Sequence, residues 1–415
     1  MNERDGEADG GDADDALGLV LTGGGARGAH QAGVLSVVLP ALAADGIRPR
    51  IVTGASAGAI NAAGVTSTAH HPPDVQADIL ERQWRDVVLS SVARPLWQQV
   101  PRNLLGWFGE IADVGGLRLT SLLDTAPLGR HLHQAIDWGS LHHNLASGTV
   151  ERLSILATAT HGGRPTAFTE GGGDLPDSPP PAPRFVPART EPRHLLASAA
   201  IPMLFPPLEI VAPDDARGWY HDGSTRLHTP LSPALSLGAD RLLVLSATAI
   251  SPSARPDVTE PPDLADAAVA VLKAMVEDPV RRDVHRLGVV NQYLAGDDGA
   301  RRYRSDRGRD PYRVVPYGFI APDDTDDIGE LALDLFRRRY SGLAARKGVD
   351  LQVLHRLLGG DSPLQGELLS YLLFDRDFMA ELIRLGRAAG ERWLAGGGWR
   401  TNVLDELREP APSTG

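Results

Sequence analysis

The sequence contains no cysteine among its 415 residues. It therefore forms no disulfide, offers no thiolate nucleophile and has no cysteine ligand for zinc, which fits a cytoplasmic protein. Positive charge is in deficit, since 41 Lys and Arg face 53 Asp and Glu and the formal net charge is -12. Because such a chain repels phosphates, we expect no nucleic-acid partner and no simple electrostatic docking on anionic lipid.

Long hydrophobic runs are missing as well. A membrane-spanning helix needs about 18 uninterrupted apolar residues, whereas the nearest run, residues 32–44, is shorter and contains Ser36 and Pro40. No basic stretch followed by an apolar core opens the sequence, so no secretory signal is expected. Residues 1–16 carry seven acids and one arginine without apolar periodicity, which predicts a disordered acidic tail.

The apolar residues that are present follow the alternation typical of an α/β fold. The run 17–22 predicts a buried strand, and residues 28–44 repeat apolar positions at helical spacing up to Gly46. A second short strand, 50–54, and a second helix, 57–69, follow. This order predicts the opening of a parallel sheet covered by helices.

The rest of the chain continues with further strands and helices. Strands are predicted at 152–160, 165–169, 208–211, 241–247 and 313–321. The Pro/Gly-rich segment 171–192 is predicted to be a surface loop, and a short helix is predicted after it at 193–200. From residue 326 onward the pattern is that of several amphipathic helices, to which the sequence assigns no chemical role.

The first candidate site is the glycine-rich turn Gly23–Gly28. It fails as a nucleotide-binding P-loop, because Ala29 and His30 stand where Lys and Ser/Thr are required. A dinucleotide fingerprint matches in spacing, but no acidic residue ends the second strand. The third interpretation is an anion hole, in which backbone N–H groups and the following helix stabilise a developing oxyanion. A tight turn without a ligand is the fourth.

The second candidate site is Ser56, within the pattern G-x-S-x-G from Gly54 to Gly58. A nucleophilic serine on a strained strand-to-helix turn requires small neighbours, and Ala55, Ala57 and the two glycines meet that requirement. The Ala57 N–H is then expected near the reacting oxygen. A small-residue helix packing site is the alternative, because a glycine-rich chain also matches this pattern by chance.

The two candidate sites are expected to lie together. Adjacent parallel strands end at the same sheet edge, so the glycine-rich turn and Ser56 should face one crevice, as in an acyl-transfer site. The serine needs a base, and none of the 13 histidines stands out by its local context. Asp222, followed by Gly223 and Ser224 after an apolar-aromatic run, is the better candidate, although Asp-Gly is also a common plain turn.

These segments together resemble the patatin-like phospholipases. Four motifs of that family occur in its order, namely G-G-G-x-R-G at Gly23–Gly28, G-x-S-x-G at Gly54–Gly58, A-S-x-A-x-P-x-x-F-x-P at Ala197–Pro207 and D-G-G/A at Asp222–Ser224. The resemblance implies a three-layer α/β/α fold with a mostly parallel central sheet over residues 17–320. A C-terminal helical region is expected over residues 326–407.

The resemblance also implies a Ser–Asp dyad, with Ser56 as nucleophile and Asp222 as proton acceptor. The implied oxyanion hole is the glycine-rich turn, that is Gly23, Gly24, Gly25, Ala26, Arg27 and Gly28. Arg27 has three open roles, which are orienting this turn, meeting a substrate phosphate, or lying solvated at the surface. Ser224 departs from the family, which has Gly or Ala there, and its hydroxyl is expected to lower the basicity of Asp222.

The implied activity is that of a serine lipid acyl hydrolase, similar to a phospholipase A or lysophospholipase, that needs no metal and no cofactor. Its expected partners are a lipid or acyl-ester substrate and, by peripheral contact, the membrane. The aromatic stretch 84–111, with Trp84, Trp97, Trp107 and Phe108, predicts either a substrate-facing cap or helical packing on the sheet. A catalytically weak or inactive lipid-binding or regulatory protein of the same fold is the alternative, because of Ser224.

Overall fold

The computed structural model describes most of the chain between residues 15 and 399. The described residues are 15–94, 121, 123–177, 182–226, 231–249, 264–296, 306, 312–323, 325–340 and 365–399. Most of the predicted acidic tail lies outside them, as do Trp97, Trp107 and Phe108 of the predicted cap. Both therefore stay predictions.

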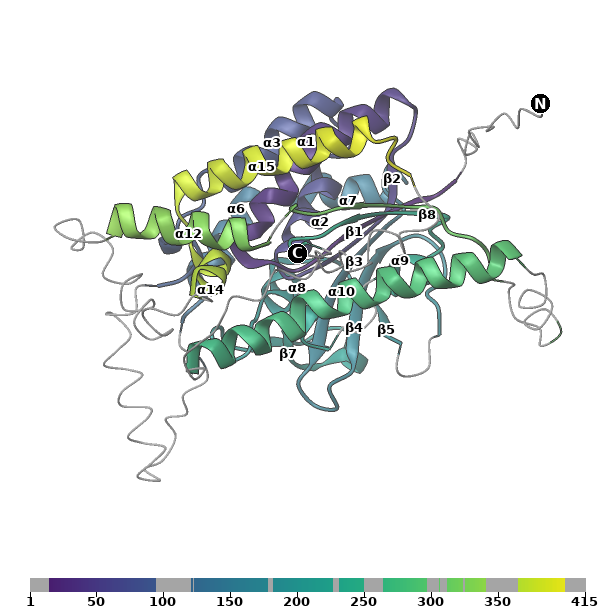
Figure 1. Ribbon diagram of the computed structural model, residues 1–415. Coiled ribbons are helices and arrows are strands. Elements are labelled where there is room, and N and C mark those ends of the chain that lie inside the picture. Colours follow the sequence, from purple (N-terminus) through teal and green to yellow (C-terminus); the bar gives the residue numbers. More distant parts are fainter. Residues whose placement is uncertain are drawn as a thin grey trace, which may run out of the picture.

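A single sheet forms the centre of the molecule (Figure 1). In the described part of the chain its strands are β1 (Leu17–Leu21), β2 (Pro49–Ala55), β3 (Arg152–Ala159), β4 (Pro165–Gly171), β5 (Arg184–Pro187), β6 (Leu208–Ile210), β7 (Gly218–Asp222), β8 (Arg241–Leu245) and β9 (Tyr317–Ile320). The order is β5-β4-β3-β2-β1-β8-β9, and all pairs from β3 to β9 are parallel. β4 and β7 run antiparallel to β3, and β6 pairs with β7. The predicted mostly parallel sheet is confirmed.

Alternating side chains of the central strands fill separate cores on the two faces of the sheet. Leu17, Leu19 and Leu21 pack on one face with α1 (Gly28–Ala44), α2 (Ala57–Thr68), α6 (Ala126–Ala135) and α7 (Trp138–Ala146). Val20 packs on the other face with α9 (Ser232–Ser236) and α10 (Leu264–Gly296). Figure 1 shows α10 below the sheet and α1 above it. Because the central strands are covered on both faces, their residues are mostly apolar, and the predicted three-layer α/β/α arrangement is confirmed.

The C-terminal region contains the helices α12 (Thr325–Tyr340), α14 (Gln365–Leu372) and α15 (Arg376–Ala395). α15 packs along α1, and α12 packs against α14 and α15. α1 and α15 approach each other closely at two glycines. A Cβ on Gly33 would lie 2.1 Å from the Ile383 carbonyl oxygen, and one on Gly386 would lie 2.0 Å from that of His30. Larger residues at these positions would push the helices apart. The predicted C-terminal helices are confirmed, whereas the predicted limits of the two regions stay predictions.

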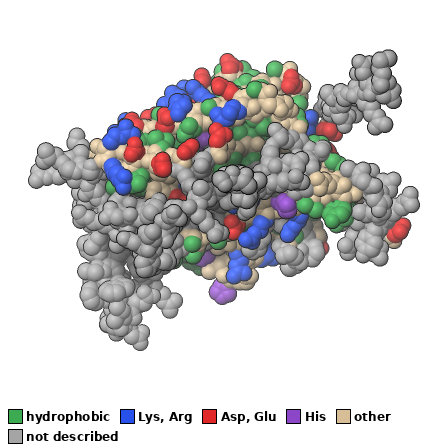
Figure 2. All heavy atoms as spheres, in the orientation of Figure 1, with side chains coloured by type: hydrophobic (Ala, Val, Ile, Leu, Met, Phe, Trp, Pro, Cys, Tyr) green, Lys and Arg blue, Asp and Glu red, His purple; other side chains and the backbone are tan. Residues whose placement is uncertain are grey.

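The outer surface of α12 and α15 carries arginine and acidic side chains side by side (Figure 2). Arg338 pairs with Asp334 on α12, and Arg384 pairs with Glu381 on α15. The inner faces of the same helices are apolar, so both helices are amphipathic and cover the core. Among the described residues, no helix combines the length and the apolar character that a membrane span requires.

Two short strands were not expected from the sequence. Within the segment 171–192, predicted to be a surface loop, Arg184–Pro187 form β5 at the sheet edge. Residues 218–222, which precede the candidate base, form β7. Prolines and glycines dominate the sequence around β5, and β7 begins at a glycine and ends in two polar residues, so neither segment shows a clear strand pattern. Pro187 is tolerated because β5 pairs only with β4.

Candidate active site

Ser56 occupies the sharp turn between β2 and α2. Its backbone has φ 55° and ψ -126°, a conformation that is costly for any residue other than glycine. The flanking glycines are required by packing, since a Cβ on Gly54 would lie 2.3 Å from the Gly58 carbonyl oxygen and one on Gly58 would lie 2.2 Å from that of Leu21. The turn therefore has the geometry of a nucleophile elbow at the end of a strand.

Ser198 holds this turn in place. Its hydroxyl accepts a hydrogen bond from the Ser56 N–H at 2.9 Å and donates one to the Leu156 carbonyl oxygen at 2.6 Å. Ser198 ends α8 (Pro192–Ser198), and shortly after it the Ala200 carbonyl oxygen accepts a hydrogen bond from the Asp222 N–H at 2.9 Å. The segment after α8 thus ties Ser56 and Asp222 to one scaffold.

Asp222 ends β7, which runs beside β3 with Asp222 opposite Ala157. Its side chain is buried, and its Oδ1 accepts a hydrogen bond from the Ser224 N–H at 2.8 Å. Burial raises the pKa of Asp222 from 3.8 to about 6, against the lowering effect of hydrogen bonds from the Ser56 hydroxyl and from Ser224. The result is a carboxylate of unusual basicity next to the Ser56 side chain.

The glycine-rich turn packs directly against this pair of side chains. A Cβ on Gly23 would lie 2.5 Å from the Ser224 hydroxyl oxygen and 3.2 Å from the Ser56 Cβ. Among the described residues, the Gly24 and Gly25 N–H groups have no hydrogen-bond acceptor. α1 begins directly after the turn at Gly28. The structure therefore brings the predicted glycine-rich turn, Ser56 and Asp222 together at one sheet edge.

Arg27 lies in the interior. Its side chain is fully buried. Its Nε donates a hydrogen bond to the Ser370 hydroxyl at 2.8 Å and its Nη1 donates one to the Tyr371 hydroxyl at 3.3 Å, while the guanidinium carbon lies 4.1 Å from the centre of the Tyr371 ring. The interpretation of Arg27 as a solvated surface residue is therefore wrong, and its partners come from α14.

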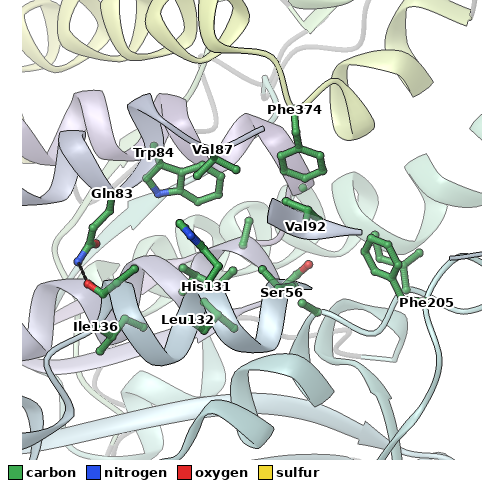
Figure 3. A pocket seen from close by; sticks show the side chains of 17 residues that line it. Ser56, Gln83, Trp84, Val87, Val92, His131, Leu132, Ile136, Phe205 and Phe374 are labelled. Carbon is green, nitrogen blue, oxygen red and sulfur yellow. Dashed lines mark hydrogen bonds between the residues drawn. The ribbon is translucent and has the colours of Figure 1, made fainter. Parts of the chain in front are cut away.

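An apolar cleft opens beside Ser56 (Figure 3). Its empty space is about 660 Å³, the solvent at its mouth included. Trp84 of α3 (Pro73–Arg85) forms part of its wall and is oriented by a hydrogen bond from its Nε1 to the Asn61 Oδ1 at 2.6 Å. In Figure 3, Gln83 and Ile136 lie at the end away from Ser56, where the Gln83 amide donates to the Ala135 carbonyl oxygen at 3.1 Å. Such a lining suits a hydrocarbon chain.

Two residues of this cleft had no signal in the sequence. His131 of α6 lies in its wall, and burial lowers the pKa of its imidazole. In Figure 3 the His131 ring extends toward Trp84 rather than toward the Ser56 hydroxyl. Phe374, which follows α14 in the C-terminal region, also forms part of the cleft wall. Only the tertiary fold brings these two side chains into the cleft.

No cluster of three or more His, Asp or Glu side chains suited to holding a metal ion occurs among the residues that the structure describes. Asp222 is the strongest candidate for the base that accepts the Ser56 proton, because its carboxyl group is buried, has a raised pKa and lies next to Ser56.

Comparison with known proteins identifies the family. The family model of the patatin-like phospholipases matches residues 19–235, which is more than half of the chain. No match is found among curated protein sequences. Among solved structures, the crystal structure of VipD from Legionella pneumophila matches over 92% of this chain and 67% of that chain, with 14% sequence identity and a TM-score of 0.32. At that level of similarity, it adds nothing to the family match.

Proposed function

Because the chain belongs to the patatin-like phospholipase family, we propose that it cleaves fatty-acyl ester bonds with a Ser56–Asp222 dyad and a backbone oxyanion hole. Family membership by itself supports a lipid acyl hydrolase, which is a carboxylic ester hydrolase. One observation carries the finer proposal. Three segments distant in the chain, the strained Ser56 turn, the buried Asp222 carboxylate and the glycine-rich turn, meet at one end of an apolar cleft.

In the first half-reaction, Asp222 removes the hydroxyl proton of Ser56 as its Oγ attacks the ester carbonyl carbon. A pKa of about 6 supports this role, because such a carboxylate is more basic than usual and still ionised at neutral pH. The N–H groups of Gly24, Gly25 and Ala26 stabilise the oxyanion, with the Ala57 N–H and the positive end of α2 close by. The ester C–O bond then breaks, and the alcohol leaves with the proton from Asp222.

In the second half-reaction, a water molecule attacks the acyl group on Ser56. Asp222 accepts the proton of this water, and the same N–H groups stabilise the second oxyanion. When the bond to Ser56 breaks, Asp222 returns the proton to the serine oxygen and the fatty acid is released. Each proton is thus moved by the carboxylate of Asp222 alone.

The cleft supports a fatty-acyl substrate. Its described walls are nearly all apolar, with Val87, Leu132 and Phe205 among them. We assign the acyl chain to the path from Ser56 toward Gln83 and Ile136, because burying its methylene groups there removes them from water. The polar part of the lipid then stays at the mouth, as in a phospholipase A or lysophospholipase.

Ser224 is the basis for the alternative, a weak or inactive lipid-binding or regulatory protein. Both its N–H and its hydroxyl lower the pKa of Asp222. Burial raises the pKa by more, so that it lies at about 6 despite Ser224. This balance favours turnover over passive binding.

The central experiment compares Ser56→Ala and Asp222→Asn with the unaltered chain. We expect kcat for a soluble short-chain ester to fall by at least about 10³-fold in each variant. Labelling by a fluorophosphonate probe should disappear in Ser56→Ala. Full activity in Ser56→Ala would remove Ser56 as the nucleophile.

His131→Gln is the matched control, because His131 is a histidine of the cleft wall. We expect it to keep kcat within about twofold. A dead His131→Gln together with an active Asp222→Asn would transfer the role of base to the histidine.

The substrate class is tested by incubating a mixed membrane lipid extract with the unaltered chain and with Ser56→Ala. Formation of lysophospholipid and fatty acid from phospholipid would identify a phospholipase A. Release of fatty acid from lysophospholipid would identify a lysophospholipase. Saturable lipid binding without any product would favour the non-catalytic alternative.

A further inference from the structure

The end of helix α14 contacts the glycine-rich turn, although it is remote from it in the chain. The family match ends at residue 235, whereas α14 comprises Gln365–Leu372. Its hydroxyl-bearing residues Ser370 and Tyr371 both bind the buried side chain of Arg27. A segment outside the matched region therefore holds a residue of the oxyanion turn.

The backbone of α14 touches the same turn at a second point. Gly25 has φ 55°, and a Cβ placed on it would lie 2.3 Å from the Tyr371 carbonyl oxygen. Gly25 also lines the cleft, and its N–H is one of the proposed oxyanion donors. Tyr371 is thus in contact with a donor residue through its carbonyl and with Arg27 through its side chain.

The buried guanidinium explains why this contact is specific. A buried charge is costly unless hydrogen bonds and an opposite charge compensate it. Ser370 donates its own proton to the Glu367 carbonyl oxygen at 2.5 Å, so its lone pair is directed to the Arg27 Nε. The Glu367 carboxylate lies 3.9 Å from the Arg27 Nη2. Few other positions of Arg27 would satisfy these requirements together.

We propose that α14 is a positioning element of the active site, which holds the Gly24 and Gly25 N–H groups in place for the oxyanion through Arg27 and Gly25. This inference rests on the proposed function, since it concerns a step at Ser56. Arg27 links α14 to the backbone of the glycine-rich turn, because the Arg27 side chain binds α14 and the Arg27 N–H donates a hydrogen bond to the Gly24 carbonyl oxygen at 3.0 Å. The C-terminal helices then serve turnover as well as stability.

The test uses the full chain with Arg27→Lys, Ser370→Ala and Tyr371→Phe, and measures kcat and KM on a soluble short-chain ester. Lysine keeps the charge of Arg27 but lacks its planar fork of donors. We expect Arg27→Lys to lower kcat by about 10²-fold with KM within about twofold, because donors misplaced by about 1 Å lose the transition state more than the ground state. Ser370→Ala and Tyr371→Phe should each lower kcat by about fivefold.

Arg387→Gln provides the matched control. Arg387 of α15 pairs with the buried Glu81 of α3, so it also ties the C-terminal helices to the core, but at a point that does not involve the glycine-rich turn. We expect this variant to lower the melting temperature and to leave kcat of the folded protein within about twofold.

Unchanged kcat in all three α14-contact variants, with only the melting temperature lowered, would overturn the inference. If Arg27→Lys does not fold, Ser370→Ala and Tyr371→Phe decide the question. Ser56→Ala, measured in the same series, distinguishes a failure of the proposed function from a failure of the positioning role of α14. An active Ser56→Ala overturns the proposed function, whereas a dead Ser56→Ala beside fully active α14-contact variants overturns the positioning role alone.

Discussion

Asp222→Asn should make the protein more stable at neutral pH while it removes activity. Burial raises the pKa of Asp222 from 3.8 to about 6, so its ionised form is less stable in the folded chain than in the unfolded one. A difference of about two pKa units, at about 1.4 kcal/mol per unit, corresponds to about 3 kcal/mol of lost stability. Asparagine does not ionise, and its Oδ1 can still accept the Ser224 N–H.

The sign of the pH dependence follows from the direction of this pKa shift. Below the unfolded-state pKa, Asp222 is protonated in both states and costs nothing. As the pH rises from 3.8 to about 6, the unfolded chain loses the proton first and stability falls; above about 6 the loss is complete. The stability advantage of Asp222→Asn should therefore grow from near zero at the acid end to about 3 kcal/mol at pH ~8.

Urea unfolding across this pH range measures the effect. Asp283→Asn is the matched control, because burial also raises the pKa of Asp283 to about 6, and this residue lies on α10, on the far side of the sheet from Ser56. The Asp283→Asn variant should be more stable than the unaltered chain in the same pH window and should keep its activity. The kcat/KM of the unaltered chain should rise with pH and level off above about 6. A pH-independent stability difference would refute the assignment of a raised pKa to Asp222.

Three further predictions concern the cleft, its mouth and the interior. Ala135→Phe should lower kcat/KM for long-chain esters by about tenfold relative to short ones; an unchanged ratio across a chain-length series would contradict the assigned acyl path. Met203 is 79% exposed with φ 70° and lies between Ile201 and Phe205 of the cleft. If its side chain contacts the lipid surface, Met203→Ser should lower activity on phospholipid vesicles by about tenfold and leave activity on soluble esters unchanged. Equal losses on both substrates would exclude a role at the lipid surface. Burial, with nearby Arg392 and Arg27, lowers the pKa of His30 to about 3. Because the unfolded chain then binds a proton that the folded chain does not, the stability should fall below pH ~6.5 and be lower by about 3 kcal/mol at pH ~4 relative to His30→Gln. If urea unfolding gives both proteins the same pH dependence of stability, this prediction is wrong.

The sequence alone determined the features that depend on neighbouring residues. The mostly apolar runs of β1, β2, β3 and β8 predicted buried strands, because a strand covered on both faces buries side chains of both orientations. The small residues around Ser56 predicted a tight turn, and the structure has φ 55° there. The four motifs indicated the family, which the family match confirms. The catalytic roles of Ser56 and Asp222 stay proposals that activity measurements test.

The tertiary structure alone decided which distant residues meet. β7 is placed beside β3 by backbone pairing, and this brings Asp222 to Ser56 and buries its carboxylate. The fold of α14 onto the glycine-rich turn buries Arg27, and the packing of α6 places His131 in the cleft. A pKa, a buried charge and a cleft wall all depend on the atoms that surround a group in space. Hydrophobic periodicity records only which side of an element is covered, and it does not say by what.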